Sequence, residues 1–251
     1  MKKSLKVTII LISIIAIVAG IIIFIKLNDG NEPPVVEVPS GDVEVEDNLA
    51  EKVLIKDNIV KNKTDNRYID CVYPIITSLN DKEFENSINT QIALNIQEYR
   101  NEIEYIIDEE TEATEMYSYI TYYDRYNSGK YLSLVIDQDY QTGGIRSNKW
   151  KDIYNINAKT ERLFYLNELF EPGVDFQTAI IEEIEKQAVA KNYELMGGNG
   201  LTKLPTKQKF YIKDDVLVIY FDPSEAAATV FGELHFEMPF KMNDEGKFEI
   251  K

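Results

Sequence analysis

Hydrophobic and polar residues alternate in several short segments of the chain, and this period of two predicts β-strands. The alternating segments are residues 53–60, 67–76, 116–126, 131–140, 150–157, 209–213 and 216–221, and a last apolar piece covers 234–240. Asn127, Ser128 and Gly129 stand between two of these segments and favour a hairpin turn. Short strands joined by tight turns indicate an antiparallel sheet.

Two longer segments place apolar residues at steps of three and four, which predicts amphipathic helices. The first covers residues 81–107, where Asn80 or Asp81 can act as the cap, and the second opens with Pro172, Gly173 and Asp175. The predicted buried stripes are Phe84, Ile88, Ile92 or Gln91, Asn95, Ile96 and Tyr99 in the first helix, and Phe176, Ala179, Ile180, Ile184, Gln187 and Ala188 in the second. The fold class is therefore α+β, with an antiparallel sheet and two main helices.

Residues 7–25 carry no charge and predict one transmembrane helix ahead of this domain. At about 1.5 Å per residue the helix spans roughly 28 Å, close to a hydrocarbon core of about 30 Å. Lys2, Lys3 and Lys6 precede the run, so residues 1–6 are expected to form a cytoplasmic stub and the rest to lie outside. A cleaved signal peptide is the competing interpretation, but Ile17 stands where a cleavage site needs a small residue.

The remaining chain divides into a tether and two parts of one domain. Residues 26–50 hold two adjacent prolines and acids interleaved with valines, which is typical of a flexible acidic tether. Residues 51–150 and 151–251 are expected to form the amino-terminal and carboxy-terminal parts of the extracytoplasmic domain. A lipid anchor is not expected, because the only cysteine, Cys71, lies far from the apolar run.

Charge narrows the choice of partners. The chain has 43 Asp and Glu against 27 Lys and Arg, and its formal net charge is −16. This balance argues against binding to nucleic acid or to an anionic membrane surface, both of which favour Lys and Arg patches. It suits a cationic partner, although many soluble domains are acidic for solubility alone. A single cysteine forms no internal disulfide, so the domain must rely on its core.

Candidate catalytic chemistry is sparse. His235 is the only histidine and has no nucleophile motif near it, so it is expected to end a strand rather than to act as a base. Asp137 and Asp139 share one face of a predicted strand and could in principle form a carboxylate pair, although solvated sheet positions explain them as well. Gly197, Gly198 and Gly200 are better explained as a helix end than as a phosphate loop, and no cofactor or metal site is predicted.

A family resemblance adds to this interpretation. The segment from Phe210 to Pro223, with Tyr140, Gln141, Thr142, Gly143 and Gly144 upstream, resembles the extracytoplasmic domain of RsiV-type anti-sigma factors. Residues 53–140, including Tyr73 and Pro74, resemble the companion domain of PdaC-type peptidoglycan deacetylases. The resemblance implies a bacterial envelope protein with an extracytoplasmic sensing or binding domain, and in the RsiV branch a domain that binds lysozyme.

The chain departs from both relatives. Residues 1–6 are too few for the segment with which anti-sigma factors hold a sigma factor, and the chain ends at Lys251 without a deacetylase domain. The family's Gly-Gly-small-His loop reads Gly143, Gly144, Ile145 and Arg146 here, and Ala226, Ala227 and Ala228 replace part of its segment after the Asp-Pro turn. We therefore expect a related binding module whose specificity has changed.

The function predicted from the sequence is that of a single-pass membrane protein whose non-catalytic outer domain binds a protein, with cationic lysozyme as the sharpest candidate. It would act as a decoy, an inhibitor or a sensing subunit. The alternatives are a peptidoglycan or glycan-binding module, a structural partner in a membrane complex and, less favoured, a carboxylate-based hydrolase. The predicted partner-binding residues are Tyr140, Thr142, Gly143, Gly144, Arg146, Asp222 and Glu225, together with exposed tyrosines between 117 and 126.

Overall fold

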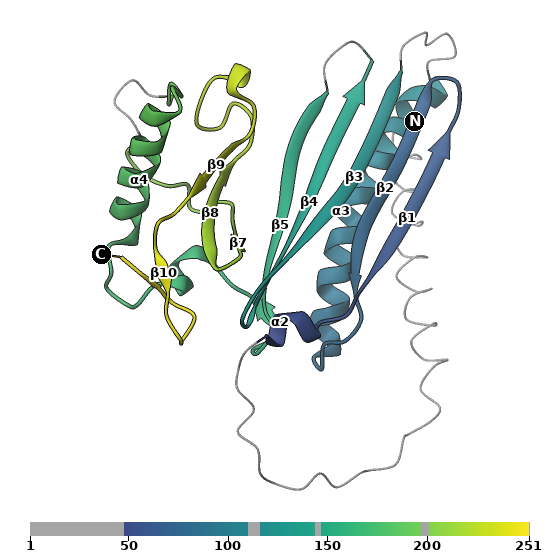
Figure 1. Cartoon of the computed structure of the whole chain (residues 1–251). Helices are drawn as coiled ribbons and strands as arrows, with labels where there is room; N and C mark the ends of the chain where they lie inside the picture. The colour runs from purple at the N-terminus through teal and green to yellow at the C-terminus, as the bar shows by residue number, and fades with distance from the viewer. Residues whose placement is uncertain (1–47, 110–115, 144–146, 197–200, 251) are drawn as a thin grey trace, which may run out of the picture. The chain divides into compact units, whose positions relative to one another are not determined.

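A six-stranded sheet forms the larger of two packed sheets (Figure 1). The computed structural model describes residues 48–109, 116–143, 147–196 and 201–250. The strands are β1 (Ile55–Lys63), β2 (Arg67–Ile76), β3 (Tyr117–Ser128), β4 (Tyr131–Thr142), β5 (Asn148–Asn157) and β6 (Arg162–Leu163), and they pair in chain order. The expected strands and the hairpin between β3 and β4 are confirmed, and the α+β fold class holds.

One pair of strands in this sheet is parallel. β2 and β3 run in the same direction over Arg67–Cys71 and Tyr117–Thr121, whereas the other neighbours are antiparallel. The helix α3 (Lys82–Glu109) lies between them in the chain and returns it to the end where β2 began. Parallel strands need such a crossover, and the sheet is therefore mixed rather than antiparallel throughout.

The helix α3 covers one face of the sheet and builds the larger core with it. Ile88, Ile92, Ile96 and Ile103 are buried at steps of four and seven. They pack against alternate residues of the strands, among them Ile69, Cys71, Tyr119, Leu132, Leu134, Ile136, Tyr154 and Ile156. Figure 1 shows α3 running along the sheet behind β2 and β3.

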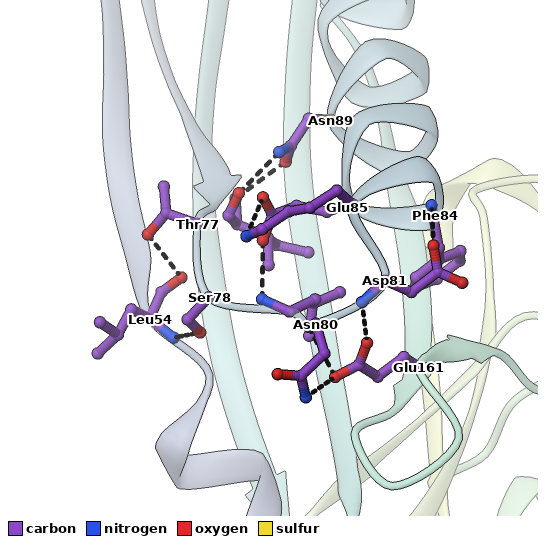
Figure 2. Close-up of polar contacts among 12 residues, drawn as sticks. Leu54, Thr77, Ser78, Asn80, Asp81, Phe84, Glu85, Asn89 and Glu161 are labelled. Carbon is purple, nitrogen blue, oxygen red and sulfur yellow. Dashed lines mark hydrogen bonds and ion pairs between the residues drawn. The ribbon is translucent and has the colours of Figure 1, made fainter. Parts of the chain in front are cut away.

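Side-chain hydrogen bonds fix the turn that leads from β2 into α3 (Figure 2). Asp81 caps the helix by accepting from the Phe84 amide at 2.9 Å, and Asn89 bonds both the amide and the carbonyl of Ile76 at 2.9 and 2.7 Å. Glu161, from the turn between β5 and β6, accepts hydrogen bonds from the amides of Asn80 and Asp81. These contacts hold the start of the helix against the sheet.

The smaller sheet has three antiparallel strands and is covered on one face by α4. Its strands are β7 (Phe210–Lys213), β8 (Val216–Phe221) and β9 (Leu234–Glu237), and α4 spans Phe176–Ala190. Ile180, Ile184 and Ala188 of the helix form one core with alternate strand residues, including Phe210, Ile212, Leu217, Ile219, Phe221, Leu234 and Phe236. The short elements are α2 (Leu49–Lys52), η1 (Leu166–Leu169), η2 (Thr229–Phe231), β10 (Lys241–Met242) and β11 (Phe248–Glu249).

The uncovered face of the smaller sheet packs against β3, β4 and β5 of the larger one. Val135 of β4 contacts the cluster of Val218 and Tyr220 from β8. The Ile212 amide donates to Ser133 Oγ at 3.1 Å, and Asn155 donates to the Phe210 carbonyl at 2.8 Å. The two sheets are thus joined by both apolar and polar contacts.

Two of the predicted segment boundaries can be compared with the structure. Regular structure begins at Leu49, inside the segment interpreted as tether, because Ala50 is fully buried and its amide donates to the Gly129 carbonyl. The predicted division at residue 150 falls inside β5. The predicted anchor, residues 7–25, lies outside the described residues, and among those that are described no helix is long and apolar enough to cross a membrane.

Candidate functional site

A group of charged side chains lies between the two sheets, and we call it the inter-sheet cluster. It consists of Asp137 on β4, Lys151 on β5, Tyr211 on β7, Glu233 before β9 and His235 on β9. Asp137 and Lys151 face each other in the β4–β5 register. Both point away from α3, because the residues on either side of them in the strand, such as Ile136 and Trp150, pack in the α3 core.

Lys151 is the centre of this cluster. It is only 9 % exposed, and its Nζ pairs with Asp137 and, at 3.1 Å, with Glu233 Oε2. Burial disfavours the ammonium form, but the carboxylates of Asp137 and Glu233 outweigh it and raise the pKa of Lys151. The lysine is therefore a permanently charged group held between two carboxylates.

Glu233 continues the cluster to His235 and Tyr211. Its Oε2 lies 3.5 Å from His235 Nε2, and His235 Nδ1 lies 3.1 Å from the Tyr211 hydroxyl. The hydrogen bond from His235 and the charge of Lys151 lower the pKa of Glu233 to about 2, against the opposing effect of burial. Burial raises the pKa of Tyr211 to about 12, so this phenol keeps its proton.

A second charged arm ties β8 to β5 and contains two of the predicted binding residues. Lys209 Nζ pairs with Asp222 and donates to the Lys151 carbonyl at 2.7 Å. Asp222 Oδ1 accepts from the Lys151 amide at 3.2 Å and from the Tyr220 hydroxyl at 2.8 Å. Glu225 accepts from the Asp222 amide at 3.0 Å. Asp222 and Glu225 therefore shape the turn that leaves β8.

The other predicted binding residues lie at the end of β4. Tyr140 faces α3 and is 7 % exposed, and its ring lies 5.7 Å from that of Tyr99. Thr142 is exposed and ends the strand, and Gly143 follows with φ 67°, a left-handed conformation that suits glycine. Gly144 and Arg146 lie outside the described residues. Tyr140 and Asp222 do not form one site. Tyr140 packs on the face of the larger sheet that α3 covers, whereas Asp222 contacts β5 from the smaller sheet on the opposite face.

A cleft of about 990 Å³ opens where the turns of several hairpins meet. Tyr131 and Phe240 contribute apolar surface, and the lining carries four acids, Asp214, Asp215, Asp244 and Glu245, against two lysines, Lys130 and Lys241. None of these four carboxylates forms an ion pair with a residue in the described part of the chain. The cleft thus combines an acidic rim with aromatic surface.

The contacts of the inter-sheet cluster connect the two sheets and contain no activated nucleophile. Lys151 pairs with both Asp137 and Glu233, and His235 bonds a tyrosine that keeps its proton rather than a serine or cysteine nucleophile. Cys71 is buried on the α3 side, where burial raises the pKa of its thiol to about 11. Among the described residues, no group of three His, Cys, Asp or Glu side chains could hold a metal ion.

Sequence reasoning missed this cluster as a unit. It placed His235 on a strand and Asp137 with Asp139 on one face, and both placements agree with the structure. It did not connect Lys151, Glu233 and Tyr211 to them. The available signal was the position of Lys151 directly after Trp150 in an alternating strand, which predicts a lysine on the face opposite the tryptophan.

Fold and site together define an α+β domain of two packed sheets, and two family models match parts of it. Residues 60–148 match the family model described as deacetylase PdaC, and residues 167–241 match a protein family of unknown function, DUF3298. Each match covers less than half of the chain. The predicted likeness to PdaC-type deacetylases is confirmed. The segment from Phe210 to Pro223, predicted to resemble RsiV-type anti-sigma factors, lies within the DUF3298 match, whereas residues 140–144 lie within the PdaC match.

Solved structures share the fold. A DUF3298 family member from Bacteroides fragilis is 14 % identical, with a TM-score of 0.56 over 79 % of this chain and 94 % of that chain. A DUF3298 family protein from Pseudomonas aeruginosa is 9 % identical, with a TM-score of 0.51 over 79 % of this chain and 93 % of that chain. No curated protein matches the sequence. At these identities the similarity concerns the fold alone.

Proposed function

We propose that this chain is a single-pass membrane protein of the bacterial envelope whose extracytoplasmic domain binds a cationic protein and carries out no catalysis. Residues 7–25 act as the anchor, residues 1–6 stay in the cytoplasm, and lysozyme is the foremost candidate ligand. The apolar run and the lysines before it support the anchor. The matched families support an envelope role.

The observation that carries the proposed ligand class is the distribution of charge. The chain has a net charge of −16, and in the inter-sheet cluster the carboxylates of Asp137 and Glu233 both pair with Lys151. The acids on the rim of the cleft, by contrast, have no ion-pair partner in the described residues and remain available to steer a cationic protein. Thr142, Gly143, Gly144, Arg146, Asp222 and Glu225 stay the proposed contacts at the loops after β4 and β8.

Calorimetric titration of the full chain, held in detergent, with a cationic lysozyme tests this proposal. Measurements at about 0.05 and 0.15 M salt differ appreciably in screening. Submicromolar binding that survives the higher salt supports a specific receptor or inhibitor. Binding that vanishes with salt reduces the acidic surface to nonspecific attraction and overturns the proposal.

A variant with a neutralised cleft rim then tests whether the cleft contacts lysozyme. Asp214→Asn, Asp215→Asn, Asp244→Asn and Glu245→Gln together remove the acidic rim, and asparagine suits the positive φ of 50° and 61° at positions 214 and 215. The matched control removes four exposed acids elsewhere, at Asp65, Glu171, Glu182 and Glu194. If lysozyme binding weakens in the cleft variant but not in the control, the cleft is a contact surface. If it weakens equally in both variants, the effect comes from net charge.

Binding to wall glycan is the second candidate function. Tyr122 supports it, because 55 % of this residue is exposed on a sheet face and tyrosine offers both a flat ring and a polar tip. A pull-down on purified peptidoglycan tests the candidate, and absence of retention removes it.

A carboxylate hydrolase is the least favoured function. Asp137 and Asp139 do share one face, but Asp137 pairs with Lys151 and Asp139 with Lys149 at 3.1 Å. A catalytic pair requires one carboxyl group that can give up a proton, and a lysine partner stabilises the ionised form instead. Turnover of a glycan, peptide or ester that Asp137→Asn abolishes would reverse this ranking.

A further inference from the structure

We propose that Asp152 is a proton-operated switch that sets how tightly α3, from Asn95 onward, packs on β4 and β5. Asp152 lies on β5, and the neighbours that share its face of the strand, Trp150 and Tyr154, belong to the α3 core. Asp152 is therefore on the face opposite Lys151 and is not part of the inter-sheet cluster. The inference goes beyond the proposed ligand and does not depend on what the domain binds.

A chain of side-chain hydrogen bonds ends at the Asp152 carboxylate. The Tyr119 hydroxyl of β3 donates to Gln138 Oε1 of β4, so the amide nitrogen of Gln138 is left to donate, and it donates to Asp152 Oδ2. Asn95 of α3 hydrogen-bonds Asp152 and also donates to the Tyr154 hydroxyl at 2.9 Å. The charge of Asp152 is thus felt by α3 and by three neighbouring strands.

This carboxylate has hydrogen-bond donors but no counter-charge of its own. No cation in the described part of the chain forms an ion pair with Asp152. Lys209 attracts it from the smaller sheet, but Asp222, which pairs with Lys209, repels it. Arg100 of α3 acts on Cys71 and Tyr73 of β2 instead.

The titratable groups around Asp152 on the α3 face are acids and phenols. They are Glu98, Tyr99 and Glu102 of α3, Tyr119 of β3, Tyr140 of β4 and Tyr154 of β5. Burial raises the pKa of all four phenols, so they remain neutral. Glu98 and Glu102 lie near Tyr99 and add negative charge. None of these groups offsets an ionised Asp152.

The direction of the switch follows from this environment. Burial raises the pKa of Asp152 above its ordinary value of about 3.9, against the opposing effects of Lys209, Asn95 and Gln138. A raised folded pKa gives stability that is complete below the unfolded value and is lost as the pH rises through the folded value. At neutral pH a partly buried carboxylate without a counter-charge therefore disfavours close packing of α3, and acidification tightens it.

Trp150 reports this change, because it is the only tryptophan, shares the face of Asp152 and has its ring 4.7 Å from that of Tyr99. The fluorescence of the full chain in detergent is measured from about pH 8 to about pH 3.5. We expect a transition with a midpoint above the ordinary aspartate value. Asp152→Asn keeps the shape of the side chain without its charge and is expected to lose the transition. Asp139→Asn is the matched control, since Asp139 lies on the opposite face and pairs with Lys149.

Two further variants separate the switch from other titrations. Gln138→Met leaves Asp152 in place but removes a donor to its carboxylate, so the midpoint is expected to shift upward. His235→Gln removes the only imidazole and is expected to leave the transition unchanged. The inference is overturned by a midpoint at the ordinary aspartate value, by a transition that survives in Asp152→Asn, by a downward shift in Gln138→Met, or by loss of the transition in either control.

Hydrogen exchange tests the effect on packing. The backbone amides of α3 from Asn95 to Ile103 are compared between the unaltered chain and Asp152→Asn at the same pH, so that intrinsic exchange rates cancel. We expect faster exchange in the unaltered chain at neutral pH and equal exchange below the midpoint. Equal exchange at neutral pH would show that the charge of Asp152 does not affect α3. Neither result bears on the lysozyme titration, so the two proposals are judged separately.

Discussion

Lys151 shows how much a single buried charge depends on its partners. Replacing it by methionine keeps the length of the side chain but leaves Asp137, which is 7 % exposed, buried without its counter-charge. We expect Lys151→Met to lower the free energy of unfolding by about 3–5 kcal/mol. Urea denaturation monitored by the fluorescence of Trp150 measures the change.

Lys149→Met is the matched control for that prediction. Lys149 lies on β5 on the same face as Lys151 and pairs with Asp139 of β4, but 57 % of its side chain is exposed. An exposed pair contributes about 0–1 kcal/mol. Equal losses in the two variants would show that burial of Lys151 has no energetic role.

The lowered pKa of Glu233 makes the stability of the contact between the two sheets depend on pH in the acidic range. Its pKa lies near 2 in the folded protein because of His235 and Lys151, against about 4.3 for an unperturbed glutamate. A lowered folded pKa gives stability that is complete above the unfolded value and is lost as the pH falls from about 4.5 toward 2. We expect Glu233→Gln to flatten this part of the stability profile, measured by urea denaturation from pH 6 to about pH 2.5.

The sequence predicts on which face of its strand each side chain of the inter-sheet cluster lies, but it does not predict that these side chains contact one another. Alternation correctly separates Trp150 from Lys151, since the first packs against Tyr99 and the second faces β8. Glu233 and Tyr211 reach Lys151 only because two sheets pack face to face, and no local pattern encodes that contact. For Tyr140, the family resemblance predicted a contact with a partner. The structure instead buries its side chain against α3, where it lies beside Tyr99.

At the scale of elements, α3 depends on polar contacts as well as on its apolar stripe. Asn89 bonds the amide and the carbonyl of Ile76 at the end of β2. We expect Asn89→Ala to lower the free energy of unfolding by about 1–3 kcal/mol, because both backbone groups lose a partner. Thermal and urea denaturation measure the loss.

Asn86→Ala provides the control on the same helix. Asn86 is exposed one turn earlier, and the gain in helix propensity from asparagine to alanine is common to both positions. If the two substitutions change stability by the same amount, the junction between β2 and α3 does not depend on Asn89.

The elements themselves are largely predictable, and their arrangement is not. The stripe of Phe84, Ile88, Ile92 and Ile96 predicts α3 because a helix must bury one face. The parallel pairing of β2 with β3 escapes the same reasoning, because alternation defines faces and leaves strand order open. The short elements β6, β10 and β11 span two residues each, which is less than a periodic pattern needs to be detected.

At the scale of the whole molecule, β5 decides where the chain can be divided. The segment matching PdaC ends at residue 148, yet β5 begins there and pairs with β4 over its full length. Tyr154 and Ile156 of β5 are buried against α3, 5 % and 0 % exposed. The first folding unit therefore needs residues that lie beyond the matched segment.

We expect a fragment of residues 48–163 to unfold cooperatively in urea and a fragment of residues 48–150 to remain unfolded. The shorter one lacks most of β5 and exposes the edge of β4, whose Leu132, Leu134 and Ile136 belong to the α3 core. The longer one lacks η1, α4, the smaller sheet, η2, β10 and β11 and so exposes Ser133 and Val135, which should lower its stability relative to the full chain without preventing folding. Far-UV circular dichroism and Trp150 fluorescence, present in both fragments, follow the transitions. Failure of the 48–163 fragment to fold would mean that the inter-sheet cluster and the smaller sheet are part of one cooperative unit, so that a ligand bound on either sheet stabilises both.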